Sequence, residues 1–332
     1  MEAVEKGELR KIQEILQEEA PSRAQRVINN NDILFQCVRP YQKNNYIHKE
    51  PNTSMTQWVA STGYAQIRTT ESPNYIYHLL NTDGFNRKVM VRCTGSSYPA
   101  INSEDLSTIH FYLSTDKNEQ CKIARLLDLL DERIATQNKI IEDLKKLKSA
   151  ISKKLLCNDK WTTYKIQDIA EIGRGRVISS VEIDRQKHPL YPVYSSQTSN
   201  DGIMGYLDSY MFDGEYITWT TDGANAGTVF YRKGKFNCTN VCGTLKIQPK
   251  FDCYFVSLVL QQATQKYVSS NLANPKLMNN TMASIKIRMP NIETQKQLSK
   301  VFQTLDSCLL VHQRTCKMYL SEKQYLLCQM FI

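Results

Sequence analysis

Arginines, hydroxyls and amides are the side chains whose types and spacing in this sequence suggest chemistry, and that chemistry is binding. Arg174 and Arg176 alternate with Gly173 and Gly175, which predicts a loop loosened by its glycines. Guanidinium groups on such a loop are suited to phosphate oxygens or to the O6 and N7 edge of guanine. Two later segments supply further donors and acceptors suited to base edges. Their candidate nucleic-acid-binding residues are Ser195, Ser196, Gln197, Thr198, Thr220, Thr221, Asp222, Asn225 and Lys235.

The first third of the chain has a comparable polar and basic run at residues 39–45. Its candidate binding residues are Arg39, Tyr41 and Lys43. The whole chain carries a formal net charge of +9, which favours an anionic partner without naming it. Taken singly, each of these polar runs is more typical of a solvated turn, so their weight comes from the organisation around them.

The residues that catalysis requires are not grouped in this sequence. Gly234-Lys235 lacks the earlier glycine that a phosphate-binding loop needs. Asn274-Pro275-Lys276-Leu277 begins like the loop of adenine methyltransferases but lacks the second proline and the aromatic residue that hold a flipped base, so we interpret it as a loop before a helix. No proline is followed by aspartate, and the five histidines are scattered. We therefore expect a non-catalytic protein without a cofactor.

Composition is that of an ordinary protein of two or three domains, with 332 residues, 41% hydrophobic and 23% charged. No apolar run approaches the ~20 residues that cross a bilayer, and the start lacks the apolar core of a signal peptide. Ten cysteines without a tight framework fit reduced thiols in the cytoplasm. Cys238, Cys242 and Cys253 come nearest to a zinc set but lack a fourth ligand at suitable spacing, so no metal site is expected.

Two stretches 175 residues apart share one pattern of apolar residues. Alternating intervals of four and three place these residues on one stripe of a helix, the pattern that packs against a second helix. The residues of this predicted seam are Ile123, Leu127, Leu130, Ile134, Ile141, Leu298, Phe302, Leu305 and Leu309. Polar interruptions also match, Gln137 with His312 and Lys148 with Lys323. The match predicts an internal duplication and two helices of about 55 Å each.

The duplication divides the chain into four segments. They are a mixed region at 1–118, a helix at 119–157, a second mixed region at 158–292 and a second helix at 293–332. Both mixed regions have an α+β pattern. The clearest element is a hairpin predicted over 214–232, where β-branched and aromatic runs flank Asp222-Gly223 and Ala226-Gly227.

The mixed regions match each other loosely and are unequal. The loop at 94–101 matches 270–277, and Asp32-Ile33-Leu34 matches Glu215-Tyr216-Ile217 at an offset of 183. By that offset the first region has no counterpart of residues 158–183, which include the Gly-Arg-Gly-Arg segment. We therefore expect the first region to be truncated at its N-terminus relative to the second.

In their order, these segments resemble the specificity subunit of type I restriction–modification enzymes. The resemblance is carried in the second half by Tyr191-Pro192-Val193-Tyr194-Ser195-Ser196, by Gly202-Ile203-Met204-Gly205-Tyr206, by Gly214-Glu215-Tyr216-Ile217 and by Thr221-Asp222-Gly223-Ala224-Asn225-Ala226-Gly227. In the first half it is carried by Asp32-Ile33-Leu34, Val38-Arg39-Pro40 and Val59-Ala60-Ser61-Thr62-Gly63-Tyr64.

The resemblance implies a plan for the molecule. Two target-recognition domains would each read half of a split, asymmetric site in double-stranded DNA, and the two helices would pack antiparallel as a spacer. The implied partners are methyltransferase (modification) subunits and a motor-nuclease (restriction) subunit, with no membrane. The subunit itself would perform no chemistry.

Two other functions stay open. One is a stand-alone enzyme, such as a decayed methyltransferase, which binding of S-adenosylmethionine would reveal. The other is an adaptor or silent allele whose truncated first domain reads only one half-site or no longer binds DNA. Salt-dependent DNA binding separates a reading subunit from an adaptor, because phosphate contacts make log K fall with log salt.

Overall fold

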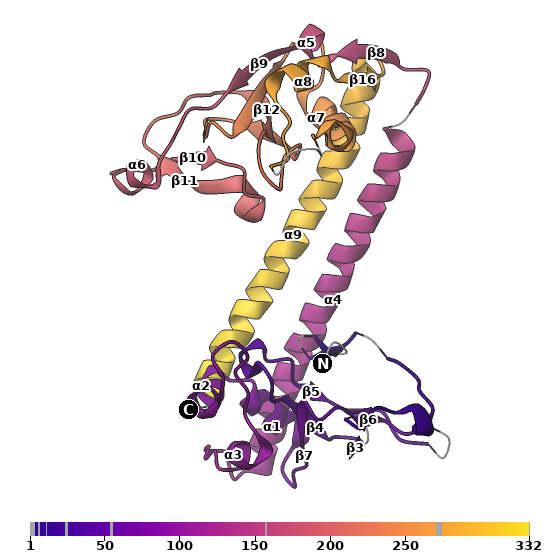
Figure 1. Ribbon diagram of the computed structural model, residues 1–332, viewed down its shortest axis with the longest axis vertical. Helices are drawn as coiled ribbons and strands as arrows, with labels where there is room; N and C mark the ends of the chain where they lie inside the picture. The colour runs from indigo at the N-terminus through magenta and orange to yellow at the C-terminus, as the bar shows by residue number, and fades with distance from the viewer. Residues whose placement is uncertain are drawn as a thin grey trace. The chain divides into compact units, whose positions relative to one another are not determined.

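The computed structural model describes residues 4–5, 7–10, 12–23, 26–53, 56–156, 158–269 and 274–331. The chain divides into unit 1, Met1–Ile141 with Val311–Ile332, and unit 2, Glu142–Leu310. Each unit combines an α+β part with segments of two long helices, α4 (Lys117–Leu155) and α9 (Ile292–Met330) (Figure 1). The α+β duplication with two long helices is thereby confirmed. Residues 270–273 of the matched loop, and the predicted helix ends Cys157 and Ile332, lie outside the described residues.

The main sheet of unit 2 is built around the predicted hairpin. Strand β12 (Glu215–Thr220) pairs with β13 (Val229–Lys233) and with β15 (Cys242–Ile247), and β9 (Ala170–Arg174) adds to β15; every pair is antiparallel. The turn between β12 and β13 uses Gly223 at φ +94°, a conformation that glycine adopts without steric cost. These pairings bring the ends of β9 and β12 to the same edge of the sheet.

Smaller elements surround this sheet. Strand β10 (Tyr191–Tyr194) pairs antiparallel with β11 (Ile203–Leu207) and parallel with β14 (Asn237–Cys238), and β8 (Thr162–Lys165) pairs with β16 (Lys286–Met289). The helices of unit 2 are α5 (Ile166–Ile169), α6 (Ser180–Asp184), α7 (Cys253–Ala263), α8 (Asn279–Ser284) and the 3-10 turns η3 (Ser199–Gly202) and η4 (Thr264–Tyr267).

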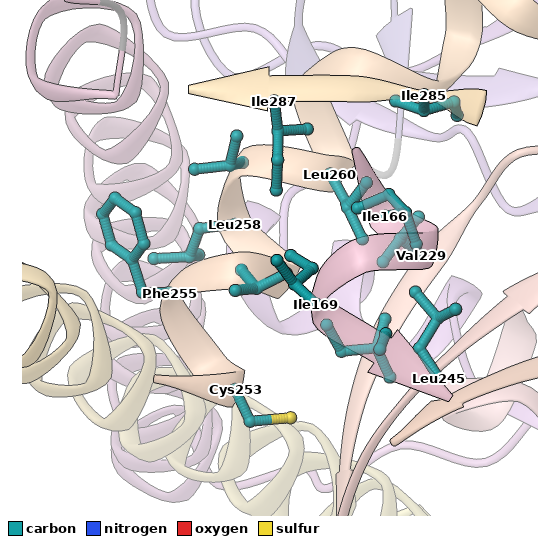
Figure 2. Close-up of a cluster of buried hydrophobic side chains, with 14 of the residues drawn as sticks. Ile166, Ile169, Val229, Leu245, Cys253, Phe255, Leu258, Leu260, Ile285 and Ile287 are labelled. Atoms are coloured by element: carbon teal, nitrogen blue, oxygen red, sulfur yellow. The ribbon is translucent and has the colours of Figure 1, made fainter. Parts of the chain in front are cut away.

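A large apolar core stabilises unit 2, and a smaller cluster of Ile178, Val193 and Leu207 lies apart from it. Side chains from α5, α7, β13, β15 and β16 meet in the large core, which Figure 2 shows. Trp219, Phe255 and Phe302 are among its fully buried members, and Phe302 belongs to α9. Burying a large apolar side chain contributes roughly 1.5–3 kcal/mol, so this core both stabilises the unit and fixes α9 to it.

Unit 1 is built in the same manner around a shorter sheet. Its central strand β4 (Ile33–Gln36) pairs antiparallel with β5 (Tyr46–Ile47) and β7 (Tyr64–Ile67). Two further pairs are β3 (Arg26–Val27) with β6 (Val59–Ala60) and β1 (Val4–Glu5) with β2 (Glu8–Leu9). Its helices are α1 (Pro73–Leu80), α2 (Asp83–Arg92), α3 (Ser103–Ser107) and the 3-10 turns η1 (Gln17–Glu19) and η2 (Pro40–Gln42).

The two sheets repeat each other residue by residue. Ile33 of β4 pairs with Ile47 and Ile67, while Ile217 of β12 pairs with Tyr231 and Leu245. The central strands are thus displaced by 184 residues rather than by the 183 that sequence matching predicts. Residue type alone could not set this register, because β4 is buried on both faces and has no alternating pattern. The described part of unit 1 has no strand that corresponds to β8 or β9.

An equivalent glutamine fastens each long helix to its own unit. Gln120 accepts a hydrogen bond from the backbone N of Ser72 at 3.1 Å, and Gln295 accepts one from the backbone N of Asp252 at 3.0 Å. Ser72 and Asp252 are the residues before α1 and α7. Both glutamines are buried and also donate to a backbone carbonyl of the loop before the long helix. Gln120 and Gln295 therefore make equivalent hydrogen bonds in the two copies.

The helices α4 and α9 run antiparallel within each unit. In unit 1 Lys323 donates to Asp131 at 2.5 Å, and in unit 2 Lys148 donates to Asp306. These two ion pairs are the same pair repeated, since each residue of one lies 175 positions from its counterpart in the other.

The predicted seam residues all lie on the covered side of their helices. Leu127, Leu130 and Phe302 are buried. The half-buried members are Ile123, Ile134, Ile141, Leu298, Leu305 and Leu309. Leu127 and Leu130 pack against Leu327 in unit 1.

Candidate nucleic-acid interface

Arg174 is the last residue of β9, at the edge of the sheet where β12 also ends. Its guanidinium donates to Asn240 O at 2.5 Å, to Thr221 Oγ1 at 3.1 Å and to Asp222 Oδ2 at 3.3 Å. Lys276 Nζ lies 3.6 Å from the other carboxylate oxygen of Asp222. Two cations therefore share one carboxylate, and the group keeps a positive charge. We call Arg174, Thr221, Asp222, Asn240 and Lys276 the basic edge.

Arg176 is held against the turn after β14. Gly175 N donates to Cys242 O at 3.1 Å, and Arg176 N donates to Cys238 O at 3.3 Å. A Cβ on Gly175 would lie 2.2 Å from Cys238 O, so this glycine permits close packing. The expectation of a loosened loop is therefore wrong. The Arg176 guanidinium donates to Glu182 and holds the pKa of that carboxyl below its usual value.

Thr220 and Thr221 are buried and do not face solvent, and Thr221 positions charged neighbours. The Thr221 hydroxyl donates to Asp222 Oδ2 at 2.6 Å and accepts from Arg174. Leu277 N donates to Thr221 O at 2.9 Å, which lays the loop before α8 along the end of β12. Lys276 reaches the basic edge through this pairing. The sequence placed it only in a loop before a helix, so its part in the site was missed.

The polar loop at 195–202 connects β10 to β11. Ser195 N donates to Gly202 O at 2.9 Å, and the Gln197 amide donates to Ile203 O. Asn225, in the turn after β12, donates to Ser196 O at 3.1 Å and so joins this loop to the hairpin. Thr198 is exposed, whereas Ser195, Ser196 and Gln197 are half-buried. We call residues 195–202 the polar loop.

Lys235 lies away from the other candidates. It follows β13, whose last residue Lys233 pairs with Glu215 at the start of β12. Thr220 lies at the opposite end of β12. Its ammonium lies 4.4 Å from the centroid of the Tyr210 ring. The structure therefore gathers Arg174, Thr221 and Asp222 but leaves Lys235 outside the group.

The candidates of unit 1 occupy the corresponding place after β4. Val38 bridges to Ala100, as Asp222 bridges to Lys276, and Arg39 N donates to Pro99 O at 2.8 Å. The Arg39 guanidinium lies 4.3 Å from the centroid of the Tyr98 ring. The same backbone frame thus presents a different side chain in each unit.

Two further candidates of unit 1 differ in availability. Lys43 donates to Asp83 Oδ1 at 2.5 Å and to Asn81 O at 3.0 Å, and its ammonium holds the pKa of Asp83 below the usual value. Tyr41 is exposed and free to stack against a flat partner. Lys43 is therefore engaged within the unit, while Tyr41 faces solvent.

Three cysteines of unit 2, Cys238, Cys242 and Cys253, are buried thiols. Burial raises the pKa of Cys238 and Cys242, and it raises the pKa of Cys253 to about 12. Thiols of this kind are poor nucleophiles at neutral pH. Within the described ranges, no three His, Cys, Asp or Glu side chains lie close enough to hold a metal ion. None of the described helices combines the length and apolar character needed to cross a membrane.

A family model described as the type I restriction modification DNA specificity domain matches residues 5–146 and 158–317. The chain belongs to this family. Each of the two matched segments ends inside one of the long helices, so the specificity domain is present twice, as the internal duplication predicted.

Several specificity subunits from Mycoplasma pneumoniae are similar to this chain. A putative type I specificity subunit is 40% identical over 185 residues, covering 55% of this chain and 77% of the relative. A second putative type I specificity subunit is 39% identical over 192 residues, covering 56% and 71%. The type I restriction enzyme MpnII specificity subunit is 43% identical over 145 residues, covering 43% of each chain.

Solved structures show the same fold at low sequence identity. The S subunit of a type I restriction–modification system from M. genitalium has a TM-score of 0.71 and 16% identity, covering 97% of this chain and 93% of that one. A chain from a study of complex assembly and conformational transition of the type I R-M system has a TM-score of 0.56 and 17% identity, covering 99% and 89%.

Proposed function

We propose that this chain is the sequence-reading subunit of a type I restriction–modification complex and has no catalytic residues of its own. Its target-recognition domains would be residues 1–118 and 158–292, each reading half of a split site in double-stranded DNA. Residues 119–157 and 293–332 would form the spacer between them. Membership of the specificity family supports DNA recognition, and the repeated backbone frame supports the division into two readers.

The observation that carries the proposal is that frame. In both units the segment after the central strand pairs with the loop before a short helix, Val38 with Ala100 and Asp222 with Lys276. The frame is duplicated while its side chains differ, which suits two readers of unlike half-sites. In unit 2 it presents Arg174 and Lys276, cations suited to phosphate oxygens and guanine edges.

We further propose that modification (methyltransferase) subunits and a restriction subunit dock on the long helices. Both helices carry large apolar side chains that face solvent in this chain. They include Leu126, Leu129, Leu147, Leu310, Leu320 and Tyr325. Exposed apolar side chains along a helix support a protein interface, because covering them removes apolar surface from water.

A second candidate function has an observation in its favour. The described part of unit 1 has no strand corresponding to β9, and β9 carries Arg174 in unit 2. Lys43 is also engaged by Asp83. These features favour an adaptor in which unit 2 reads its half-site and unit 1 contributes little or no base recognition.

Selection from random duplex DNA with the full chain distinguishes the candidates. A reader with two active units enriches two half-sites separated by a fixed gap. Enrichment of a single short motif supports the adaptor with one active reader. If no motif is enriched at any salt concentration, sequence reading by this chain is refuted.

Arg174→Ala with Arg176→Ala tests the basic edge together with its neighbour Arg176. We expect weaker binding of the selected duplex, and a slope of log K against log salt that is smaller by about one for each phosphate that the variant no longer binds. The matched control is Lys165→Ala with Lys286→Ala, which removes the same charge from exposed positions on the β8–β16 pair. Equal effects of the two double variants would show that only net charge matters and that the basic edge does not touch DNA.

A further inference from the structure

Arg232 differs from the other basic residues of the β12–β13 hairpin because it is buried. The sequence groups it with Lys233 and Lys235, which are exposed. Its side chain is 3% exposed, and its guanidinium carbon lies 3.6 Å from the ring centroid of Tyr194 and 4.4 Å from that of Phe230. A cation enclosed in this way has no open path to a phosphate, so contact with DNA does not account for it.

The donors of Arg232 point at the polar loop instead. Nη1 donates to Asp201 Oδ2 at 2.8 Å, and Nη2 donates to the backbone oxygen of Asp201 at 2.8 Å. Nε donates to Thr218 Oγ1 on the neighbouring strand at 3.3 Å. A single guanidinium thus ties both the side chain and the backbone of Asp201 to the sheet, a geometry that lysine cannot reproduce.

The polar loop needs such a tie because its backbone is unusual there. Asn200, Asp201 and Gly202 take φ values of 49°, 54° and 81°, three successive left-handed residues. L-residues rarely adopt this conformation, and it persists where surrounding contacts enforce it. Arg232 binds the middle residue of the three. At the other side of the loop Asn225 holds Ser196 O, so residues 195–202 are anchored to the hairpin at two points.

Burying a cation is an unfavourable way to fill space, since an apolar side chain of similar volume often stabilises a protein at least as well. What the arginine adds is one defined loop conformation. We infer that Arg232 is a positioning residue that sets the shape of the polar loop from inside the sheet and thereby determines which bases unit 2 accepts. This inference rests on the proposed function.

The corresponding position of unit 1 holds a different buried side chain. Arg232 pairs with Tyr216 on the central strand, and the displacement of 184 residues places His48 at the equivalent position, beside Tyr46 and Trp58. His48 is also fully buried. The arginine that anchors the polar loop in unit 2 therefore has no arginine counterpart in unit 1.

The test uses Asp201→Asn and Arg232→Lys in the full chain. Asp201 is 68% exposed, so its replacement leaves the core intact, and Arg232→Lys keeps the charge but not the fork of donors. We expect each variant to prefer the selected bases of one half-site over other bases at least tenfold less than the wild-type chain does. The salt slope should stay at the wild-type value because every phosphate contact remains in place. The double variant should lower the base preference no further than either single variant.

Two readouts separate a positioning role from others. Hydrogen–deuterium exchange of residues 195–202 should quicken in Asp201→Asn without DNA present, while exchange elsewhere in unit 2 stays unchanged. Lys233→Gln, next to Arg232 and exposed, serves as the control with wild-type base preference. Unchanged exchange and base preference in Asp201→Asn would overturn the inference. A salt slope reduced by about one in Arg232→Gln, which removes the charge, would do so too, because it would reveal a phosphate contact. If the wild-type chain selects no motif while exchange still quickens in Asp201→Asn, the proposed function falls and Arg232 is left with a purely structural role.

Discussion

Three arginines of unit 2 already have a carboxylate partner. Arg174 binds Asp222, Arg176 binds Glu182 and Arg232 binds Asp201. A phosphate that approaches Arg174 or Arg176 must compete with that carboxylate, so part of the attraction is already satisfied within the chain. Such exposed ion pairs are weak in water, so a DNA phosphate can displace the carboxylate. The internal pairs orient the guanidinium groups before binding.

A second residue-scale consequence concerns pH. His48 is buried, and burial lowers its pKa below the ordinary 6.5. Below pH 6.5 the unfolded chain binds a proton that folded unit 1 resists, so stability is complete above pH 6.5 and falls as the pH drops toward the folded pKa. The free energy of unfolding falls by about 1.4 kcal/mol for each pH step of one between 6.5 and the folded pKa.

We expect His48→Phe to melt with a smaller difference between pH 7.5 and pH 5.5 than the wild-type chain, in calorimetry of the full chain. His110→Phe removes an exposed histidine of the same unit and is the control. An unchanged pH dependence in His48→Phe would assign the effect to another group.

At the scale of the elements, the long helices are stabilised by local clusters with an ion pair in each unit. Leu127, Leu130 and Leu327 form one cluster in unit 1, and Leu298 and Leu305 join the core of unit 2. The predicted seam is therefore divided between two cores, one in each unit. A substitution in it should weaken the unit to which it belongs.

Leu130→Asp tests this arrangement in unit 1. A carboxylate replaces a buried apolar side chain, and we expect the free energy of unfolding of unit 1 to fall by about 3 kcal/mol or more. Leu129→Asp, on the exposed side of the same turn, should change it by less than about 0.5 kcal/mol. Calorimetric melting of both variants is the measurement, and similar effects would show that the stripe is not selectively buried. Leu305→Asp repeats the test in unit 2.

Much of the fold followed from local patterns in the sequence, and much of the site did not. Alternating intervals of four and three located both helices, and the β-branched run ending at Thr220 located the hairpin. The basic edge needs Arg174, Asp222 and Lys276 together, although 48 residues separate the first two. Such pairings depend on tertiary contacts that no local pattern contains. Arg232 stands beside exposed lysines in the sequence, and burial of its charge cannot be read from residue type.

At the scale of the whole molecule, the proposed spacer should set the gap between half-sites. Inserting seven residues after Gln137 and seven before His312 keeps the pattern of fours and threes and lengthens both helices by about 10 Å. We expect the selected motif to gain a gap of about three base pairs, with weaker binding because the added base pairs also rotate one half-site about the duplex axis.

Random-duplex selection with the lengthened chain measures the gap. The control carries the insertion in α4 alone, which should disrupt the pairing of the helices and abolish selection of the split motif. A gap identical to that of the wild-type chain would refute the spacer role.

Gln137 and His312, the polar interruptions that match in the two seams, contact each other between α4 and α9. His312 Nδ1 and Gln137 Oε1 are 2.8 Å apart, and 175 positions separate the two residues. Two identical copies would place histidine against histidine at this contact, or glutamine against glutamine. The mixed pair instead offers an amide oxygen to the ring N–H of either histidine charge state. The contact between these equivalent positions thus depends on the two copies having different residues there.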